Sequence, residues 1–89
     1  MKQHYDIIIH GKVQNVGFRY YTQKKANELQ ISGFVKNQSD GSVYIEAEGD
    51  EMELQAFLIW CHRGPQWARV DSVTANPAPL AGYNGFMVK

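Results

Sequence analysis

Apolar residues recur at every second position along two stretches of the chain, and this pattern predicts two β-strands. The first covers residues 5–10, and one of its faces carries Tyr5, Ile7 and Ile9. The second covers residues 43–48, with Val43, Ile45 and Ala47 on one face and Tyr44, Glu46 and Glu48 on the other. Because side chains of a strand point alternately to its two sides, we expect the apolar faces to meet a core and the glutamate-bearing face to meet water.

Shorter stretches also indicate extended chain. Residues 34–38 lead into Asp40-Gly41, which can supply the positive φ angles of a tight hairpin, so this stretch should turn back into the strand at 43–48. Residues 68–75 predict a further strand without strict alternation, and Phe86 and Val88 allow a short terminal one. The segment 76–85 is rich in proline and glycine and predicts a loop.

Two other stretches have the three- and four-residue spacing of an amphipathic helix. The first helix begins near Phe18, and its apolar face carries Phe18, Thr22, Ala26 and Leu29. The apolar face of the second carries Leu54, Phe57, Leu58 and Cys61. Asp50 followed by Glu53 resembles a capping box at the start of the second helix, and Gly64-Pro65 ends it.

The predicted order of elements is β-α-β-β-α-β, with a short fifth strand at the end of the sequence. Right-handed crossovers place both helices on one face of a mostly antiparallel sheet. The sequence therefore predicts the α+β class, as a two-layer sandwich of ferredoxin-like type, in a single domain covering residues 1–89. Enzymes, regulatory modules and RNA-binding proteins all use this fold, so it does not identify a function.

Composition and charge narrow the classes of function. The formal net charge is +0, so the chain lacks the basic excess that binding to a long run of phosphates requires, and we expect no nucleic-acid partner. Cys61 is the only cysteine and fits a reducing compartment, and no apolar run approaches the roughly 20 residues of a membrane span. We expect a cytoplasmic monomer without a membrane contact. His4, His10 and His62 lack zinc-ligand spacing, so we expect no metal and no other cofactor.

The segment 11–19, with the sequence G-K-V-Q-N-V-G-F-R, lies between the first predicted strand and the first helix. Backbone N–H groups at the start of a helix lack intrahelical acceptors and can bind an anion. Arg19, on the first helical turn, adds a permanently charged guanidinium group that can pair with two phosphate oxygens. The alternative is that the glycines only form a turn and that Arg19 is a solvated surface cation.

Asn37 lies near the end of the strand at 34–38, which we expect next to the first strand and therefore within reach of the loop at 14–19. A neutral amide does not take a proton at pH 7, but it can orient a water molecule while a phosphate oxygen accepts the proton. The alternative is that Asn37 only prepares the turn at Asp40-Gly41.

These two segments together resemble the signatures of the acylphosphatase family. The first signature has the form G-x-V-Q-G-V-x-F-R and is matched by Gly11, Val13, Gln14, Val16, Phe18 and Arg19. The second has the form G-x-V-x-N-x-x-D-G-x-V and is matched by Gly33, Val35, Asn37, Asp40, Gly41 and Val43. The stretch from Gly64-Pro65 to Val73 also resembles a third region of the family, so the likeness covers nearly the whole chain.

The resemblance implies metal-independent hydrolysis of the carboxyl–phosphate bond of a small-molecule acylphosphate. It assigns phosphate binding to Arg19 and orientation of the attacking water to Asn37. It assigns a backbone cradle, where we expect phosphate or sulfate to bind, to Gln14, Asn15, Val16, Gly17, Phe18 and Arg19. Asn15 stands where the family usually has glycine. Because asparagine tolerates a positive φ best after glycine, we expect the activity to survive.

Other functions stay open from the residues alone. A non-catalytic module that binds an anion or small molecule would keep the cradle, and Asn15 favours it. The presence of both Arg19 and Asn37 favours an enzyme, because a module that only binds an anion has no evident use for a water-orienting amide. An RNA-binding domain of the same fold is disfavoured by the neutral charge. We expect four aromatic residues to be packing or surface residues: Tyr20, Tyr21, Trp60 and Trp67. We expect Glu46 and Asp71 to be surface charges. The acyl group of the substrate should lie largely in solvent.

Overall fold

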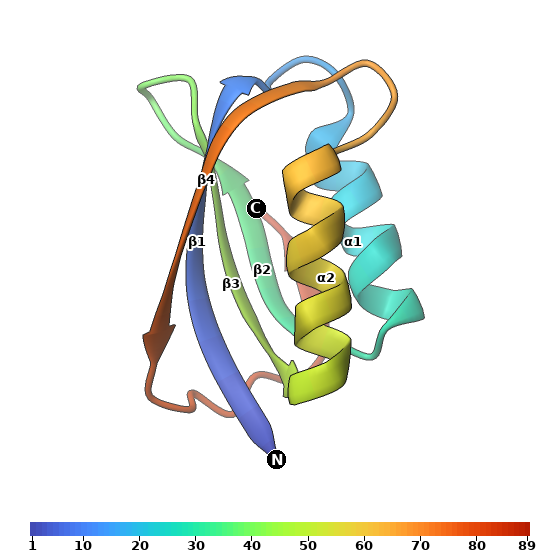
Figure 1. Ribbon diagram of the computed structural model, residues 1–89, viewed down its shortest axis with the longest axis vertical. Helices are drawn as coiled ribbons and strands as arrows, with labels where there is room; N and C mark the ends of the chain where they lie inside the picture. Colours follow the sequence, from blue (N-terminus) through green and yellow to red (C-terminus); the bar gives the residue numbers. More distant parts are fainter.

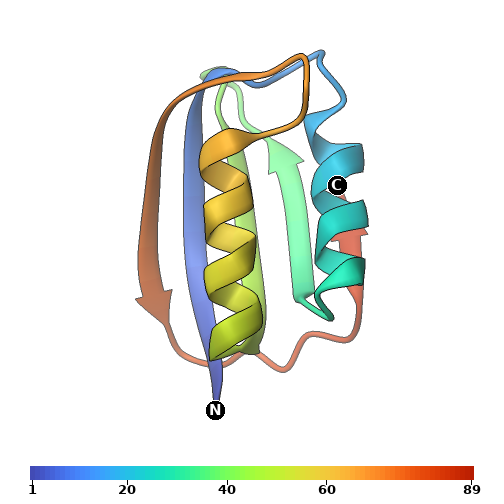
Figure 2. The same ribbon diagram turned by 45° about the vertical axis from the view of Figure 1, so that its right-hand side comes forward.

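Five β-strands form one sheet, and both helices cover the same face of it (Figure 1, Figure 2). The structure is a computed structural model that describes residues 1–89. The elements in chain order are β1 (Lys2–Lys12), α1 (Phe18–Glu28), β2 (Ser32–Asn37), β3 (Val43–Asp50), α2 (Glu51–Arg63), β4 (Arg69–Ala78) and β5 (Phe86–Val88). This arrangement confirms the ferredoxin-like α+β prediction, including the short fifth strand.

The strand order in the sheet is β4-β1-β3-β2-β5. All neighbours are antiparallel except β2 and β5, which run parallel. The expectation that the strand carrying Asn37 lies next to the first strand is wrong, because β3 lies between β1 and β2. The hairpin pairs β2 with one side of β3, and β1 occupies the other side of β3.

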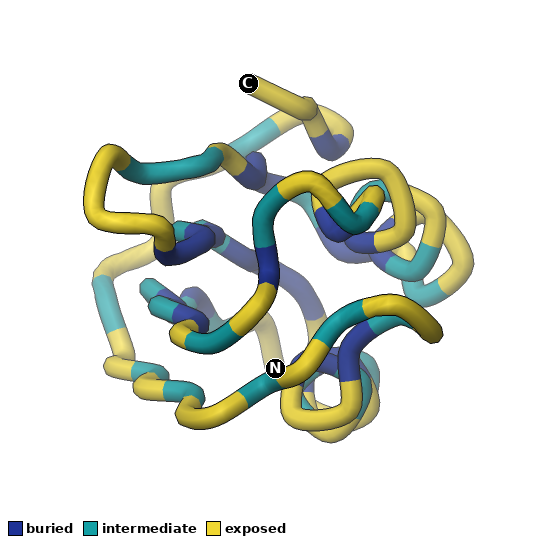
Figure 3. The backbone as a smooth tube through the Cα atoms, turned by 90° about the horizontal axis from the view of Figure 1, so that it is seen from above, coloured by how far each residue is buried: buried dark blue, intermediate teal, exposed yellow.

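The core lies between the helices and the apolar faces of the strands, as Figure 3 shows along the longest axis of the molecule. Its fully buried members include Ile7, Ile9, Val43, Ile45 and Ala47 from the strands and Ala26, Leu54, Phe57 and Cys61 from the helices. The helical and alternating patterns predicted these positions. The ring of Phe57 packs edge-on against that of Phe86, with 6.2 Å between centroids, so α2 also holds β5 in place.

The segment 79–85 connects the two edge strands β4 and β5 and crosses the opposite face of the sheet at one end, where β4 ends (Figure 1). Glu48, expected to meet water, is only 2% exposed. Its carboxylate accepts hydrogen bonds from the backbone N–H groups of Ala81 (2.6 Å), Gly82 (3.0 Å) and Tyr83 (3.2 Å). The expectation that Glu48 meets water is therefore wrong, because the connection between β4 and β5 crosses the sheet at this residue.

One predicted boundary and one predicted helix cap also differ from the structure. β4 continues to Ala78, so residues 76–78 belong to a strand and not to a loop. Pro77 is compatible with this strand because β4 lies at the edge of the sheet, where one side of the strand needs no hydrogen-bonded neighbour. The helix α2 begins after Asp50 as predicted, but the Asp50 side chain makes no capping hydrogen bond. Neither helix has the length and apolar character needed to cross a membrane.

Candidate active site

The chain between β1 and α1 forms a loop with two left-handed residues. Gly11 lies just before this loop, near the end of β1, at an irregularity in the β1–β4 pairing, and has a φ of 135°. A Cβ atom there would overlap the carbonyl oxygen of Arg69, so only glycine fits. Asn15 has a φ of 62° and Gly17 a φ of 77°. The position of Asn15 therefore does require a positive φ, and asparagine adopts it.

The backbone N–H groups of this loop are free. Those of residues 14–20 donate no hydrogen bond to any backbone or side-chain group, and the first helical bond runs from the N–H of Tyr21 to the carbonyl of Gly17. Unpaired donors of this kind, at the positive end of a helix dipole, favour an anion. The loop can therefore cradle a phosphate group.

A cavity of about 320 Å³ lies between this loop, α1 and the ends of β2 and β5. It is lined by Val13, Asn15, Gly17, Phe18, Arg19, Tyr20, Gln23, Asn37 and Val88. Of the predicted cradle, Gln14 and Val16 do not line it. Val13, Tyr20, Gln23 and Val88 were not predicted as site residues, and Val88 comes from the far end of the sequence.

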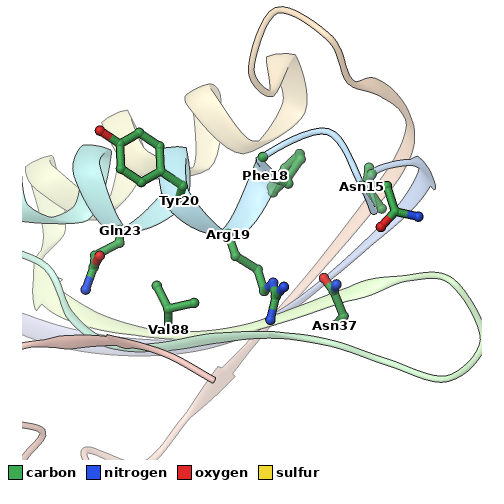
Figure 4. A pocket seen from close by; sticks show the side chains of 9 residues that line it. Asn15, Phe18, Arg19, Tyr20, Gln23, Asn37 and Val88 are labelled. Atoms are coloured by element: carbon green, nitrogen blue, oxygen red, sulfur yellow. The ribbon is translucent and has the colours of Figure 1, made fainter.

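Arg19 and Asn37 come together in this cavity, as Figure 4 shows. Arg19 extends from the first turn of α1, and its Nη1 donates a 2.8 Å hydrogen bond to the backbone oxygen of Lys89. Asn37 is the last residue of β2, and its side-chain amide makes no hydrogen bond within the chain. The two residues meet because α1 packs over β2 and β5, whereas α2 packs over β1, β3 and β4.

Gln14 connects the loop to the β2–β3 hairpin. Its Nε2 donates hydrogen bonds to the carbonyl oxygens of Gln38 (2.7 Å) and Ser42 (2.9 Å). The hairpin is closed by Asp40, which accepts hydrogen bonds from the Ser42 hydroxyl and N–H. These bonds lower the pKa of Asp40 below its ordinary value. The turn is thus stabilised without the Asn37 side chain, which leaves that amide available to a ligand.

A second polar cluster lies on the opposite face of the sheet and contributes no residue to this cavity. The Nε2 of His4 is 3.3 Å from Asp6 Oδ1 and 3.2 Å from Glu46 Oε1, and its Nδ1 is 3.2 Å from Glu48 Oε2. The potential ligand atoms of His4, Asp6 and Glu46 lie within 4.8 Å of one another and could hold a metal ion. Linear spacing did not reveal this group, because Glu46 faces Asp6 only through strand pairing.

Hydrogen bonds outweigh the effect of burial on the pKa values of the two glutamates in this cluster. Burial alone raises the pKa of Glu48, but the bonds from the segment 81–83 and from His4 outweigh it and lower the pKa. Burial also raises the pKa of Glu46. The hydrogen bonds that its carboxylate accepts from the Tyr83 and Tyr44 hydroxyls outweigh this effect, so the pKa of Glu46 is lowered as well. The expectation that Glu46 is a simple surface charge is wrong, whereas Asp71 is exposed and pairs with Arg69 at 3.0 Å.

Comparison with known proteins identifies the family. The acylphosphatase family model matches residues 5–88. The acylphosphatase of Synechococcus sp. (strain CC9311) is 42% identical over 89 residues, which cover 100% of this chain and 99% of the relative. The acylphosphatase of Archaeoglobus fulgidus is 46% identical over 93% of each chain. The crystal structure of acylphosphatase from Bacillus subtilis has a TM-score of 0.95 at 38% identity and covers 100% of this chain and 99% of that one. With its fold and its sequence in agreement with these proteins over nearly its full length, this chain belongs to the acylphosphatase family.

Proposed function

We propose that this acylphosphatase binds the phosphate group of its substrate at the loop of residues 15–19 and attacks it with a water molecule oriented by Asn37. Membership of the family assigns hydrolysis of acylphosphates, and the proposal concerns how the residues achieve it. The observation that carries it is the meeting of Arg19 and Asn37 around one cavity with Asn15 and Gly17, which belong to a loop whose N–H groups donate no hydrogen bond within the chain.

Phosphate binding uses the charge and donors on one side of the cavity. The phosphoryl oxygens accept hydrogen bonds from the N–H groups of the loop and from the guanidinium group of Arg19. The bond from Arg19 Nη1 to Lys89 occupies one donor and restrains the guanidinium group, while its other N–H groups stay available to the substrate. Donors that are already aligned stabilise the charge that develops on the phosphoryl oxygens without reorganising.

The nucleophile is a water molecule held by the Asn37 amide. Its oxygen forms a bond to phosphorus as the bond from phosphorus to the acyl oxygen breaks, and the electron pair leaves with the carboxylate. A phosphoryl oxygen accepts the proton of the water, so no side chain has to act as a base. The carboxylate is a good leaving group, so positioning and charge stabilisation suffice. Cys61 is not an alternative nucleophile, because it is fully buried and burial raises the pKa of its thiol.

The test is steady-state hydrolysis of benzoyl phosphate by the wild type and by Arg19→Ala and Asn37→Ala, with and without a metal chelator. We expect chelator-resistant activity and a loss of kcat/KM of about 100- to 1000-fold in each variant, which is typical for removal of a donor that stabilises developing charge. Arg63→Ala and Asn27→Ala are matched controls, because both residues are exposed and outside the cavity.

The controls and the physical state of the variants make the result decisive. The controls should retain the wild-type activity, and thermal unfolding should show that Arg19→Ala and Asn37→Ala are folded. A folded Asn37→Ala variant with undiminished kcat/KM would refute the role of the amide. Tight phosphate binding by a wild type without turnover would identify a binding module instead.

A further inference from the structure

We propose that Tyr20 and Val88 form a wall that holds the acyl group, so that this site favours acylphosphates with an aromatic or bulky apolar acyl group over acetyl phosphate. This inference rests on the proposed function, because it needs the phosphate group at the loop and Arg19. It replaces the expectation from the sequence that the acyl group is largely solvated.

The cavity has two chemically different sides. In Figure 4, Asn15 and Asn37 lie on one side of Arg19, and Tyr20, Gln23 and Val88 lie on the other. The first side offers amide groups and backbone N–H groups without a partner, whereas the second offers a phenol ring, an aliphatic side chain and one amide, that of Gln23, whose Nε2 is already bonded to the Phe86 carbonyl. Its volume of about 320 Å³ falls in the range of small-molecule pockets, about 300–1,000 Å³, so it has room for more than a phosphate group.

In-line attack determines which side the acyl group occupies. The attacking and leaving oxygens lie on opposite sides of phosphorus during phosphoryl transfer. A water on Asn37 therefore directs the leaving carboxylate away from Asn37, past Arg19 and toward Tyr20 and Val88. The position of the water on Asn37 thus implies that the acyl group lies on the opposite side of the cavity.

Tyr20 and Val88 have apolar surface left to bury. Tyr20 is 62% exposed and Val88 is 41% exposed, although neither is charged. An apolar group that covers them is stabilised in proportion to the area removed from water, and an aromatic group gains further from contact with the tyrosine ring. An acetyl group has a single methyl group and therefore much less apolar surface to bury.

The wall is held in place on both sides. Val88 pairs with Val35 in the sheet, and Gln23 Nε2 donates a 3.0 Å hydrogen bond to the carbonyl of Phe86, two residues before it. The Tyr20 ring has an edge contact with the Tyr21 ring at 5.0 Å between centroids. Arg19 in turn is bonded to Lys89, the residue after Val88, so the phosphate-binding group and the wall share one support.

The test compares kcat/KM for benzoyl phosphate and acetyl phosphate in the wild type, Tyr20→Ala and Val88→Ser. We expect each substitution to reduce the preference for benzoyl over acetyl phosphate by about tenfold, the size of effect that small changes in an apolar pocket produce. Tyr20→Phe keeps the ring and should retain the wild-type preference. Met87→Ala is the matched control for β5, because Met87 is 58% exposed and does not line the cavity.

The inhibition constant for inorganic phosphate separates the two ends of the site. This inhibition constant should not change in Tyr20→Ala, because the residues that bind phosphate are unaltered. A large change would refute the claim that Tyr20 contacts only the acyl group. A preference that is unchanged in Tyr20→Ala and Val88→Ser, or a parallel fall for both substrates, would overturn the inference while leaving the proposed function standing. A wild type that hydrolyses neither substrate would overturn both.

Discussion

Gln14 offers a test of how the phosphate loop and the Asn37 hairpin are held together. The substitution Gln14→Ala removes the hydrogen bonds to the carbonyls of Gln38 and Ser42. Both carbonyls keep a backbone donor, since Gly41 N–H bonds to Gln38 and Gln38 N–H bonds to Ser42. The loss is thus that of two hydrogen bonds without orphaned acceptors, about 1 kcal/mol each and about 2 kcal/mol in all.

The consequence for stability can be measured by urea and thermal unfolding. A loss of about 2 kcal/mol lowers the melting temperature of a domain of this size by roughly 10 °C. The glutamate variant Gln14→Glu should behave like alanine, because a carboxylate cannot donate to a carbonyl. Gln66→Ala is the matched control, since Gln66 is exposed and makes no side-chain hydrogen bond.

The consequence for activity follows from geometry. Gln14 fixes the spacing between the loop that carries Arg19 and the hairpin that follows Asn37, so its loss should lower kcat/KM by about ten- to a hundredfold. The reasoning is refuted if Gln14→Ala unfolds within about 0.5 kcal/mol of the wild type, the scatter of neutral surface substitutions, and keeps full activity.

Three further predictions concern other parts of the molecule. Asn15→Gly should keep the activity of the wild type and a free energy of unfolding within about 1 kcal/mol of it. Asn15→Val should lower the free energy of unfolding in urea by about 2 kcal/mol, because a β-branched residue is strained at a φ of 62°. Since the pKa of Glu48 is lowered on folding, the stability it contributes is present above its ordinary pKa and is lost as the pH falls through the lowered value. Glu48→Gln should therefore be less stable than the wild type at neutral pH, and its free energy of unfolding should fall less than that of the wild type on acidification below about pH 4.5. Equal slopes of unfolding free energy against pH in the two proteins would contradict this. Cys61 should not react with a thiol reagent in the folded protein and should react in urea, and rapid labelling of the folded protein would contradict its burial.

Local sequence patterns were enough to predict most of the fold and the parts of the site that are contiguous in the chain. The periodicity around Phe18 and Leu54 gave both helices, and alternation gave the apolar faces of β1 and β3. The loop that ends at Arg19 and the strand end at Asn37 stand out as a candidate site because both segments match signatures of the acylphosphatase family, whereas each segment taken alone is equally consistent with a simple turn.

Features that depend on pairing between distant segments could not be predicted in the same way. Val88 and Lys89 reach the site only because β5 pairs with β2, and the sequence shows no local sign of this. The burial of Glu48 depends on a connection that crosses the sheet, so alternation alone assigned it to water. The predicted position of Asn37 beside β1 was wrong for the same reason, since strand order is decided by tertiary packing.

The most direct test of the mechanism is hydrolysis of benzoyl phosphate in water enriched in oxygen-18, with mass spectrometry of both products. Attack on phosphorus by a water held at Asn37 predicts the label in inorganic phosphate and none in benzoate. Label in benzoate would show attack on the carbonyl carbon and would contradict the account.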